Sequence, residues 1–510
     1  MQLPRLIAGL EIVRLTGSPA KEVSSVCYDS RQCVPDSLFT AIPGLKADGH
    51  DFIAGAIARG ASVIVHEGDF HPPAGVTAIG VPDSRRALGL LGKNFFGDPS
   101  AELCLIAVTG TNGKTTVTYL IEAILQAAGL TAGVLGTVNY RYGGQILAAP
   151  NTTPESLDLQ RILRDMADRG VSHVVAEVSS HAIALGRVDD CAFEIGIFTN
   201  LSQDHLDYHQ TMENYFLAKK RLFSEILPAG KANRPRWMIV NSDDPWGRRI
   251  LEETAGNRLT YGLASPADVT ADPFHLSRAG ITATLRLGEE WLEITSPLLG
   301  RFNLSNILAA AGAARALGLP TEVIGAGIAS LSHVPGRLER VSSTGEPAVF
   351  VDYAHTDDAL RRVLENLAAF RSGRIITVFG CGGDRDRGKR PLMGEAAASG
   401  SDLAIVTSDN PRTEDPLEII RQIEAGIGSE RFRTAADAEK HLDRRGYLVL
   451  PERAEAIATA ITLAAPTDIV LIAGKGHEDY QIIGTWKEPF DDRIVARLAL
   501  ANRKTGENRP

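Results

Sequence analysis

The residues best suited to chemistry form one glycine-rich turn: Gly110, Thr111, Asn112, Gly113, Lys114, Thr115 and Thr116. The turn lies between an apolar run at 103–108 and a helical pattern at about 117–128. Successive backbone N–H groups at the start of a helix bind anions such as phosphate. Lys114 adds a positive charge for the β- and γ-phosphates of a nucleotide, and the Thr115 hydroxyl is suited to ligate Mg²⁺. Val108 stands where the general P-loop pattern has its first glycine, so an ordinary glycine-rich turn is the alternative.

Side chains that could hold a hard cation form a second set. Glu177 ends a predicted strand, and His205 lies in a polar segment at 200–209. Mg²⁺ prefers oxygen ligands and water, so a carboxylate suits it better than an imidazole. His205 and His209 have the spacing of a zinc-binding pair, but Leu206 stands where the H-E-x-x-H motif needs glutamate, which argues against zinc hydrolysis. Either histidine alone fits a structural hydrogen bond equally well.

Three loops in the last third of the chain mix both signs of charge, at 384–390, 409–412 and 475–478. Solvation explains one such loop. Three loops that each place carboxylates beside guanidinium or ammonium groups favour a zwitterionic substrate. Lys219, in contrast, has on composition alone the character of a solvated helix lysine.

These residues need a scaffold that brings them together. Short apolar runs alternate with helical patterns, which predicts an α/β architecture with parallel sheets. The runs predicted as strands lie at 103–108, 173–177, 195–199, 237–240, 348–352, 374–378, 403–407 and 468–472. In such sheets, ligands bind beyond the carboxyl ends of the strands. The polar segments that follow these runs, and are predicted to line the site, are 110–116, 177–180, 200–205, 352–355, 380–390, 409–412 and 474–478.

The chain has 510 residues, which is long enough for about three domains. We predict a small N-terminal α/β domain at 1–101, a central P-loop domain with a parallel sheet at 102–334, and a C-terminal Rossmann-like α/β domain at 335–510. The formal net charge of -9 argues against general nucleic-acid binding. No apolar run approaches the ~18 residues that span a bilayer. The five cysteines form no C-x-x-C pair, so we expect free thiols in the cytoplasm.

Taken together, these motifs resemble the Mur ligases, the ATP-dependent amide-forming family that builds the peptidoglycan peptide. The resemblance runs over nearly the whole chain, at 29–31, 44–50, 110–116, 151–154, 177–181, 199–209, 218–219, 303–306, 335–339, 352–355, 409–412 and 474–478. Within the family, the chain is similar to members that add meso-diaminopimelate to UDP-N-acetylmuramoyl-L-alanyl-D-glutamate. The resemblance implies amide formation through an acyl phosphate, with ATP and Mg²⁺, in cytoplasmic peptidoglycan precursor synthesis. The implied partners are these small molecules alone, and we expect a monomer.

The resemblance also implies roles for single residues. Lys114, Glu177, His205 and Lys219 would be catalytic, and Asn303, Arg337, Asp352, Tyr353 and His355 would lie near the nucleotide held by 110–116. Lys219 matches the family lysine that CO₂ carbamylates, which turns an ammonium into a carbamate with two oxygen ligands. The implied Mg²⁺ ligands are then Thr115, Glu177, His205 and carbamylated Lys219.

Two further groups of residues are implied for the other substrates. The UDP-muramoyl dipeptide would contact Tyr28, Ser30, Leu45, Lys46, Ala47, Asn151, Thr152, Thr153, Ser179 and Arg187. Diaminopimelate would contact Arg385, Asp409, Asn410, Pro411, Arg412, Gly474 and Glu478. Arg412 offers a planar fork for the second carboxylate of diaminopimelate, which lysine lacks. Leu185 is a departure, because relatives can carry a polar residue there beside the dipeptide.

Three alternatives stay open. The first is an L-lysine-adding ligase of the same family. The second is a folylpolyglutamate synthetase-like ligase, against which the motifs at 29–31 and 151–154 argue. The third is a nucleotide-regulated binding protein without turnover, against which the complete set of Thr115, Glu177, His205 and Lys219 argues.

Overall fold

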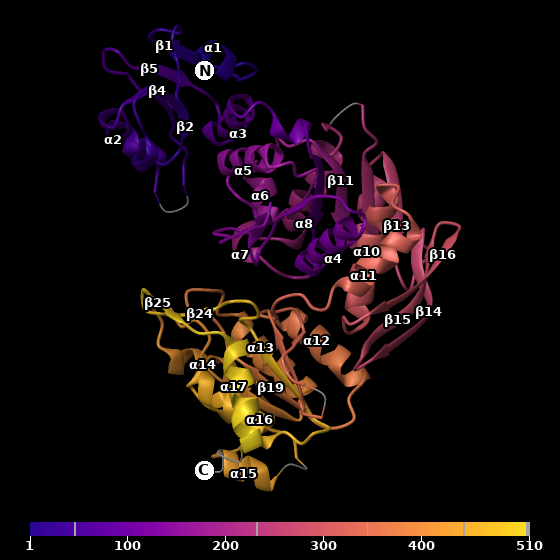
Figure 1. The fold of residues 1–510 in the computed structure, drawn as a ribbon. Coiled ribbons are helices and arrows are strands. Elements are labelled where there is room, and N and C mark those ends of the chain that lie inside the picture. Colours follow the sequence, from indigo (N-terminus) through magenta and orange to yellow (C-terminus); the bar gives the residue numbers. More distant parts are fainter. Residues whose placement is uncertain (45–46, 231–232, 344, 442–443, 506–510) are drawn as a thin grey trace.

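The structure is a computed structural model, and it describes residues 1–44, 47–230, 233–343, 345–441 and 444–505. Figure 1 shows three parts, coloured indigo, purple to pink, and orange to yellow, each built on its own sheet. Leu45 and Lys46, both predicted to contact the UDP-linked substrate, lie outside the described residues. No strand pairing among the described residues crosses the predicted domain boundaries after 101 and 334, and the boundaries themselves stay a prediction.

The N-terminal part carries a five-stranded sheet in its described residues, in the order β1-β5-β4-β3-β2. Only β1 runs antiparallel to its neighbour. The strands are β1 (Arg14–Thr16), β2 (Ser25–Cys27), β3 (Ser37–Thr40), β4 (Ala61–His66) and β5 (Thr77–Gly80). The helices are α1 (Leu3–Leu6), α2 (Ile53–Ala58) and α3 (Ser84–Phe95), with 3-10 turns at Ser30–Gln32, Gly49–Phe52 and Pro99–Ala101.

The central sheet has eleven strands among the described residues, in the order β16-β15-β14-β13-β12-β11-β6-β10-β7-β8-β9. The strands from β14 through β13, β12, β11, β6 and β10 to β7 are parallel to their neighbours, and both ends of the sheet are antiparallel. The strands are β6 (Cys104–Thr109), β7 (Ala132–Leu135), β8 (Tyr140–Tyr142), β9 (Gln145–Leu147), β10 (His173–Glu177), β11 (Phe193–Phe198), β12 (Trp237–Asn241), β13 (Asn257–Tyr261), β14 (Val269–Ser277), β15 (Gly280–Leu287) and β16 (Glu290–Ser296).

Helices cover both faces of this sheet. Side chains of β6 alternate between two cores: Ile106 and Val108 pack with α4, α10 and α11, while Leu105 and Ala107 face the core that contains α5 and α8. The helices are α4 (Lys114–Ala127), α5 (Ser156–Asp168), α6 (Ser180–Ala184), α7 (Leu206–His209), α8 (Met212–Arg221), α9 (Pro245–Glu253), α10 (Arg301–Ala316) and α11 (Thr321–Ser330), with a π-helical turn at Leu222–Ile226. Because β6 is buried along its length, its end presents the glycine-rich turn from a rigid base.

The C-terminal part has a seven-stranded sheet among its described residues, in the order β17-β18-β23-β19-β20-β22-β21. Its strands are β17 (Glu339–Arg340), β18 (Ala348–Asp352), β19 (Ile375–Phe379), β20 (Leu403–Val406), β21 (Glu430–Arg431), β22 (Gly446–Val449) and β23 (Ile469–Ala473). A separate hairpin consists of β24 (Tyr480–Ile483) and β25 (Trp486–Pro489). The helices are α12 (Asp357–Ala369), α13 (Lys389–Gly400), α14 (Pro416–Glu424), α15 (Ala435–Lys440), α16 (Arg453–Leu463) and α17 (Asp492–Thr505).

The predicted α/β architecture is confirmed, and each of the three parts has its own main sheet. The predicted strands at 173–177 and 348–352 are β10 and β18, and the other predicted strands agree with observed ones within a few residues. The central sheet is mixed and not purely parallel, because antiparallel hairpins extend both of its ends. No helix among the described residues has both the length and the apolar character to cross a membrane.

The cysteines are free thiols, as predicted, but they are not all scattered in space. The sulfurs of Cys27 and Cys33 lie 2.9 Å apart on either side of the turn at Ser30–Gln32. Burial raises the pKa of both thiols, so the protonated form dominates.

Candidate active site

The glycine-rich turn joins β6 to α4, and the helix begins at Lys114, earlier than the predicted start near 117. Gly110 and Gly113 both have positive φ, of 145° and 89°. A Cβ atom at Gly110 would lie 1.9 Å from Thr199 Oγ1, and one at Gly113 would lie 2.4 Å from Asn306 Oδ1. Glycine is therefore required at both positions, because neighbouring elements press against the turn from two sides.

Two lysine ammonium groups converge on one carbonyl of this turn. Lys114 Nζ donates to the carbonyls of Gly110 and Thr111, both at 2.9 Å. Lys219 Nζ, from α8, donates to the same Gly110 carbonyl at 3.0 Å. Lys219 is 1% exposed, so the solvated position expected from composition alone is wrong. Burial lowers the pKa of both lysines, and the charge of Lys114 lowers the pKa of Lys219 further.

Glu177 ends β10 and is buried. Its carboxylate accepts hydrogen bonds from the backbone N–H and the hydroxyl of Thr137, each at 2.9 Å. A Cβ atom at Gly136 would lie 2.5 Å from Glu177 Oε1. The connection from β7 to β8 therefore fixes the carboxylate, and no motif in the sequence pointed to this segment.

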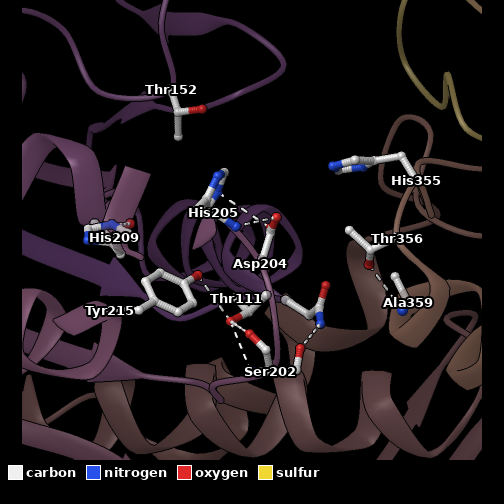
Figure 2. Close-up of polar contacts among 12 residues, drawn as sticks. Thr111, Thr152, Ser202, Asp204, His205, His209, Tyr215, His355, Thr356 and Ala359 are labelled. Atoms are coloured by element: carbon white, nitrogen blue, oxygen red, sulfur yellow. Dashed lines mark hydrogen bonds and ion pairs between the residues drawn. The ribbon is translucent and has the colours of Figure 1, made fainter. Parts of the chain in front are cut away.

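His205 and His209 separate into different environments. His205 has a left-handed backbone, with φ of 54°, and its Nε2 lies 3.4 Å from Asp204 Oδ2. In Figure 2, His355 of the C-terminal part lies on the side of His205 and Asp204 that is opposite to His209. His209 is buried, and its Nε2 lies 2.9 Å from Ser180 Oγ, which is a structural hydrogen bond.

The predicted contacts of the muramoyl dipeptide gather beside Glu177. Thr153 Oγ1 donates to the Glu177 backbone carbonyl at 2.8 Å and accepts from the Ser179 N–H at 3.1 Å. Arg187 Nη1 donates to the Thr153 carbonyl at 3.1 Å. Thr152 Oγ1 lies 3.1 Å from Thr137 Oγ1, while the Asn151 carbonyl accepts from Tyr140 OH. Of these residues, Thr153 contacts the predicted catalytic glutamate directly, and Ser179 and Arg187 contact Thr153. Thr152 contacts Thr137, which also binds that glutamate.

The N-terminal part contacts the same region. Tyr28 OH donates to Asp158 of α5 at 2.6 Å. Arg85 of α3 donates to Glu155 at 2.7 Å, and Glu155 also lies 3.3 Å from Arg187. Ser30 begins the 3-10 turn at Ser30–Gln32. Ala47 is exposed, and its carbonyl accepts from the Gly44 N–H at 3.1 Å.

The predicted nucleotide residues lie where the central and C-terminal parts meet. Arg337 Nη2 donates to Thr115 Oγ1 at 3.0 Å across this junction. A cavity of about 310 Å³ is lined by both Asn303 and Arg337. Asp352 is buried, and its carboxylate accepts hydrogen bonds from the N–H groups of Leu338 and Ala354 at 2.6 Å and 2.8 Å. It therefore orders the loop that follows β18 and joins it to Leu338. His355 Nδ1 lies 2.9 Å from the Tyr353 carbonyl.

Arg412 in the acceptor loop is held by the β24–β25 hairpin. It has a φ of 52°, its N–H donates to the Ile482 carbonyl at 3.0 Å, and its carbonyl accepts from the Gly484 N–H at 2.7 Å. Its Nη1 donates to the Gly383 carbonyl at 2.7 Å. In Figure 1 the hairpin projects from the edge of the C-terminal part that is turned toward the central part. This hairpin was not predicted from the sequence.

The other predicted acceptor residues surround Arg412. A Cβ atom at Gly382 would lie 2.9 Å from Arg412 Nη1 and 3.8 Å from Arg385 Cγ, so the two arginines flank this glycine. The loop at 409–412 meets the loop at 474–478, because a Cβ atom at Gly474 would lie 2.7 Å from Asp409 Oδ2. Pro411 is buried between Asn410 and Arg412. The structure therefore brings the predicted set together.

Only some of the predicted Mg²⁺ ligands suit a hard cation in their unmodified form. Thr115 and Glu177 offer oxygen atoms, as this ion prefers. Lys219 is a donor and cannot ligate a cation until it is modified. Among the described residues, no group of three or more His, Cys, Asp or Glu side chains is placed to hold a metal ion. The fit therefore depends on conversion of Lys219 into an oxygen ligand.

Comparison with known proteins places this chain and its fold in one family. Family models match residues 22–96 (Mur ligase family, catalytic domain), 108–314 (Mur ligase middle domain) and 336–476 (Mur ligase, glutamate ligase domain). A relative from Geobacter metallireducens is 50% identical over 95% of both chains. One from Geobacter sulfurreducens is 47% identical over 99% of this chain and 100% of its own. The chain belongs to the Mur ligase family.

Both relatives carry the same name, UDP-N-acetylmuramoyl-L-alanyl-D-glutamate–2,6-diaminopimelate ligase. A solved structure with that name is 34% identical, covers 99% of each chain and superimposes with a TM-score of 0.69.

Proposed function

We propose that this chain is an ATP-dependent ligase that joins meso-diaminopimelate to UDP-N-acetylmuramoyl-L-alanyl-D-glutamate. The observation that carries the proposal is identity of 47–50% along nearly the whole chain to relatives named for this reaction. The acceptor loops support it, because Arg412 and Arg385 flank Gly382 where a second carboxylate needs cations. The activity belongs to peptidoglycan precursor synthesis, and hence to cell wall biogenesis, in the cytoplasm.

The chemistry follows from the groups that react. A carboxylate does not condense with an amine at neutral pH, because its oxygen is a poor leaving group. Transfer of the γ-phosphate of ATP to the carboxylate gives an acyl phosphate and ADP. The amine of the acceptor attacks the acyl carbon, and the tetrahedral intermediate loses a proton and expels inorganic phosphate to leave the amide. Phosphoryl transfer needs charge neutralisation and in-line positioning more than covalent chemistry by the protein. Lys114, at the start of α4, supplies charge for the phosphates.

Lys219 is proposed to work as a carbamate. Its buried amine donates only to a backbone carbonyl in the described part of the chain, and it lies beside the phosphate-binding turn. CO₂ would add to the free amine with loss of a proton, which gives a carbamate with two oxygen atoms. Thr115, Glu177, His205 and this carbamate would hold Mg²⁺, which supplies charge stabilisation to the transferred phosphate when bound.

The other substrates are assigned to the remaining clusters. The nucleotide would extend from 110–116 toward Asn303, Arg337, Asp352 and His355. The muramoyl dipeptide would lie beside Thr153, Ser179 and Arg187, with its UDP group toward Tyr28, Ser30 and Ala47. We propose that the enzyme acts as a monomer.

An acceptor screen tests the function. Purified enzyme is given ATP and the UDP-linked dipeptide with either meso-diaminopimelate or L-lysine, and ADP release and ligated product are measured. We expect kcat/KM to favour diaminopimelate by about 10⁴-fold, since lysine leaves Arg412 without its partner. Equal values for the two acceptors would promote the lysine-adding alternative. Absence of both ADP release and ligated product with either acceptor would support a binding protein without turnover.

Variants sharpen the screen. Arg412→Ala should remove most use of diaminopimelate while ATP binding, measured by calorimetry, stays within about threefold, because the arginine lies outside the nucleotide cluster. The matched control is Arg421→Ala, an exposed arginine of α14 that is paired with Glu418 on the same helix. Its loss should leave kcat/KM within about twofold, as for other exposed pairs.

A further inference from the structure

Lys475 has no role in the reaction described so far, and it is fully buried among the acceptor loops. Gly474 and Gly476 flank it, with φ of 115° and 55°. A Cβ atom at Gly474 would lie 2.7 Å from Asp409 Oδ2, and one at Gly476 would lie 2.7 Å from Tyr353 Cβ. The two glycines let the chain pass close to both neighbours after β23, and the lysine side chain is enclosed by protein.

The ammonium of Lys475 completes a closed hydrogen-bond network. Its Nζ lies 3.3 Å from Asn410 Oδ1 and 3.2 Å from Glu478 Oε2. Asn410 Nδ2 donates to the same Glu478 oxygen at 2.9 Å. An ammonium can only donate, so the amide of Asn410 must turn its oxygen toward Lys475 and its N–H group toward Glu478. The Ile482 N–H, at 2.9 Å from Asn410 Oδ1, supports the same orientation.

A second buried ion pair nearby shows what a structural pair looks like. Arg453 and Asp492 are both fully buried and form two hydrogen bonds, at 2.8 Å and 2.6 Å. Arg453 also donates to the Ala473 carbonyl at 3.0 Å, and none of these groups is predicted to meet a substrate. Lys475 differs, because both of its side-chain partners are predicted to contact diaminopimelate.

We propose that Lys475 is a positioning residue for the distal amino-acid centre of the acceptor. This inference rests on the proposed function. Lys475 fixes the Asn410 amide and the Glu478 carboxylate in one orientation, so that their remaining hydrogen-bonding capacity is presented to the acceptor. The trio of Asp409, Glu478 and Lys475 has two carboxylates and one ammonium, and the net negative charge suits one further ammonium. The distal ammonium of diaminopimelate supplies it, while Arg412 takes the distal carboxylate.

The test is Lys475→Met, which keeps the length of the side chain and removes its charge. We expect KM for meso-diaminopimelate to rise about 10- to 100-fold, the range for lost hydrogen bonds to charged groups. The KM values for ATP and the UDP-linked dipeptide, and kcat, should change less than about threefold, because only the acceptor contacts Asn410 and Glu478. A merely structural lysine would not produce this split.

Lys487→Met is the matched control. Lys487 Nζ lies 3.5 Å from the Tyr480 ring centroid, and Lys475 Nζ lies 5.5 Å from the same ring, but Lys487 is exposed on β25. Its KM for diaminopimelate should stay within about twofold of the unmodified value, as for exposed charges. If Lys475→Met does not fold, Lys475→Gln, which keeps a donor without the charge, takes its place with the same split required.

The outcomes separate the two proposals. An unmodified enzyme that does not use meso-diaminopimelate overturns the proposed function. An unmodified enzyme that uses it, beside a folded Lys475 variant with unchanged KM for it, overturns only the role of Lys475. The role of Lys475 is likewise overturned if all three KM values rise together, or if neither variant folds.

Discussion

Around Gly110, the ammonium groups of Lys114 and Lys219 both donate to backbone carbonyls, whereas around Asn410 the ammonium of Lys475 meets a carboxylate and an amide oxygen. Both regions follow the carboxyl end of a parallel strand, β6 in one and β20 and β23 in the other. In the first region, neither lysine side chain forms a hydrogen bond with a carboxylate among the described residues. In the second region, Lys475 is already paired with Glu478 before any ligand arrives.

The difference shows that the two sites prepare for their ligands in different ways. The turn at 110–116 leaves its lysines without carboxylate hydrogen bonds, whereas the acceptor loops form a hydrogen-bond network around Lys475. Buried charge without an opposite partner is costly, and an anionic ligand relieves that cost. The turn at 110–116 is therefore suited to phosphate, and Lys219 to modification that reverses its charge. A network with its partners in place is rigid instead, and it can distinguish acceptors that differ by one carboxylate.

Among the substitutions in these two regions, removal of Lys219 should reduce activity the most. Lys219→Ala should lower kcat by about 10³-fold, as for loss of a central electrostatic group. Short-chain carboxylic acids added to the assay should restore part of the activity, because they supply the missing oxygen atoms. Lys220→Ala, which removes an exposed ion pair with Glu253, is the control and should be nearly neutral. A Lys219→Ala enzyme with full activity in CO₂-depleted buffer would contradict the carbamate.

Removal of Lys114 should have the next largest effect. We expect Lys114→Ala to lower kcat by about 10²-fold and to raise KM for ATP much less, because its charge matters most in the transition state. Steady-state kinetics with ATP as the varied substrate measures both constants. A change confined to KM would mean that Lys114 binds ground and transition states equally. Lys114 would then be a binding residue for ATP and would not contribute to the chemical step.

The smallest expected effect concerns pH and the acceptor side. Burial, with Arg337 and Arg493 nearby, lowers the pKa of His477 to about 3. The unfolded chain takes up this proton below a pKa of about 6.5 and the folded chain does not, so stability falls as pH drops from about 6.5 toward 3. The slope from one such proton is at most about 1.4 kcal/mol per pH unit. His477→Asn should flatten the dependence of unfolding free energy on pH between 7 and 5, and denaturant titrations measure it. If the slope of the unfolding free energy against pH did not change, His477 would not contribute to the pH dependence of stability.

The sequence predicted those parts that depend on local pattern. The strands β10 and β18, the turn at 110–116 and the grouping of polar residues at strand ends all follow from short runs of residues. The burial of Lys219 does not, because its partner Gly110 lies 109 residues away. The hairpin of β24 and β25 was missed for a different reason, the weakness of its local pattern. Its strands are short and largely exposed, and the loop at 409–412 that it holds is distant in sequence.

The hydrogen bond from Arg337 to Thr115 has a thermodynamic consequence. It joins the segment that follows residue 334 to the first turn of α4, so the proposed nucleotide site is also a contact between two parts of the molecule. A ligand at this turn that strengthens or weakens the contact shifts the balance between arrangements of those parts. Reciprocity then requires each arrangement to change the affinity for that ligand by the same factor. Nucleotide affinity measured with the C-terminal part held in this position should therefore differ from the affinity measured with it released.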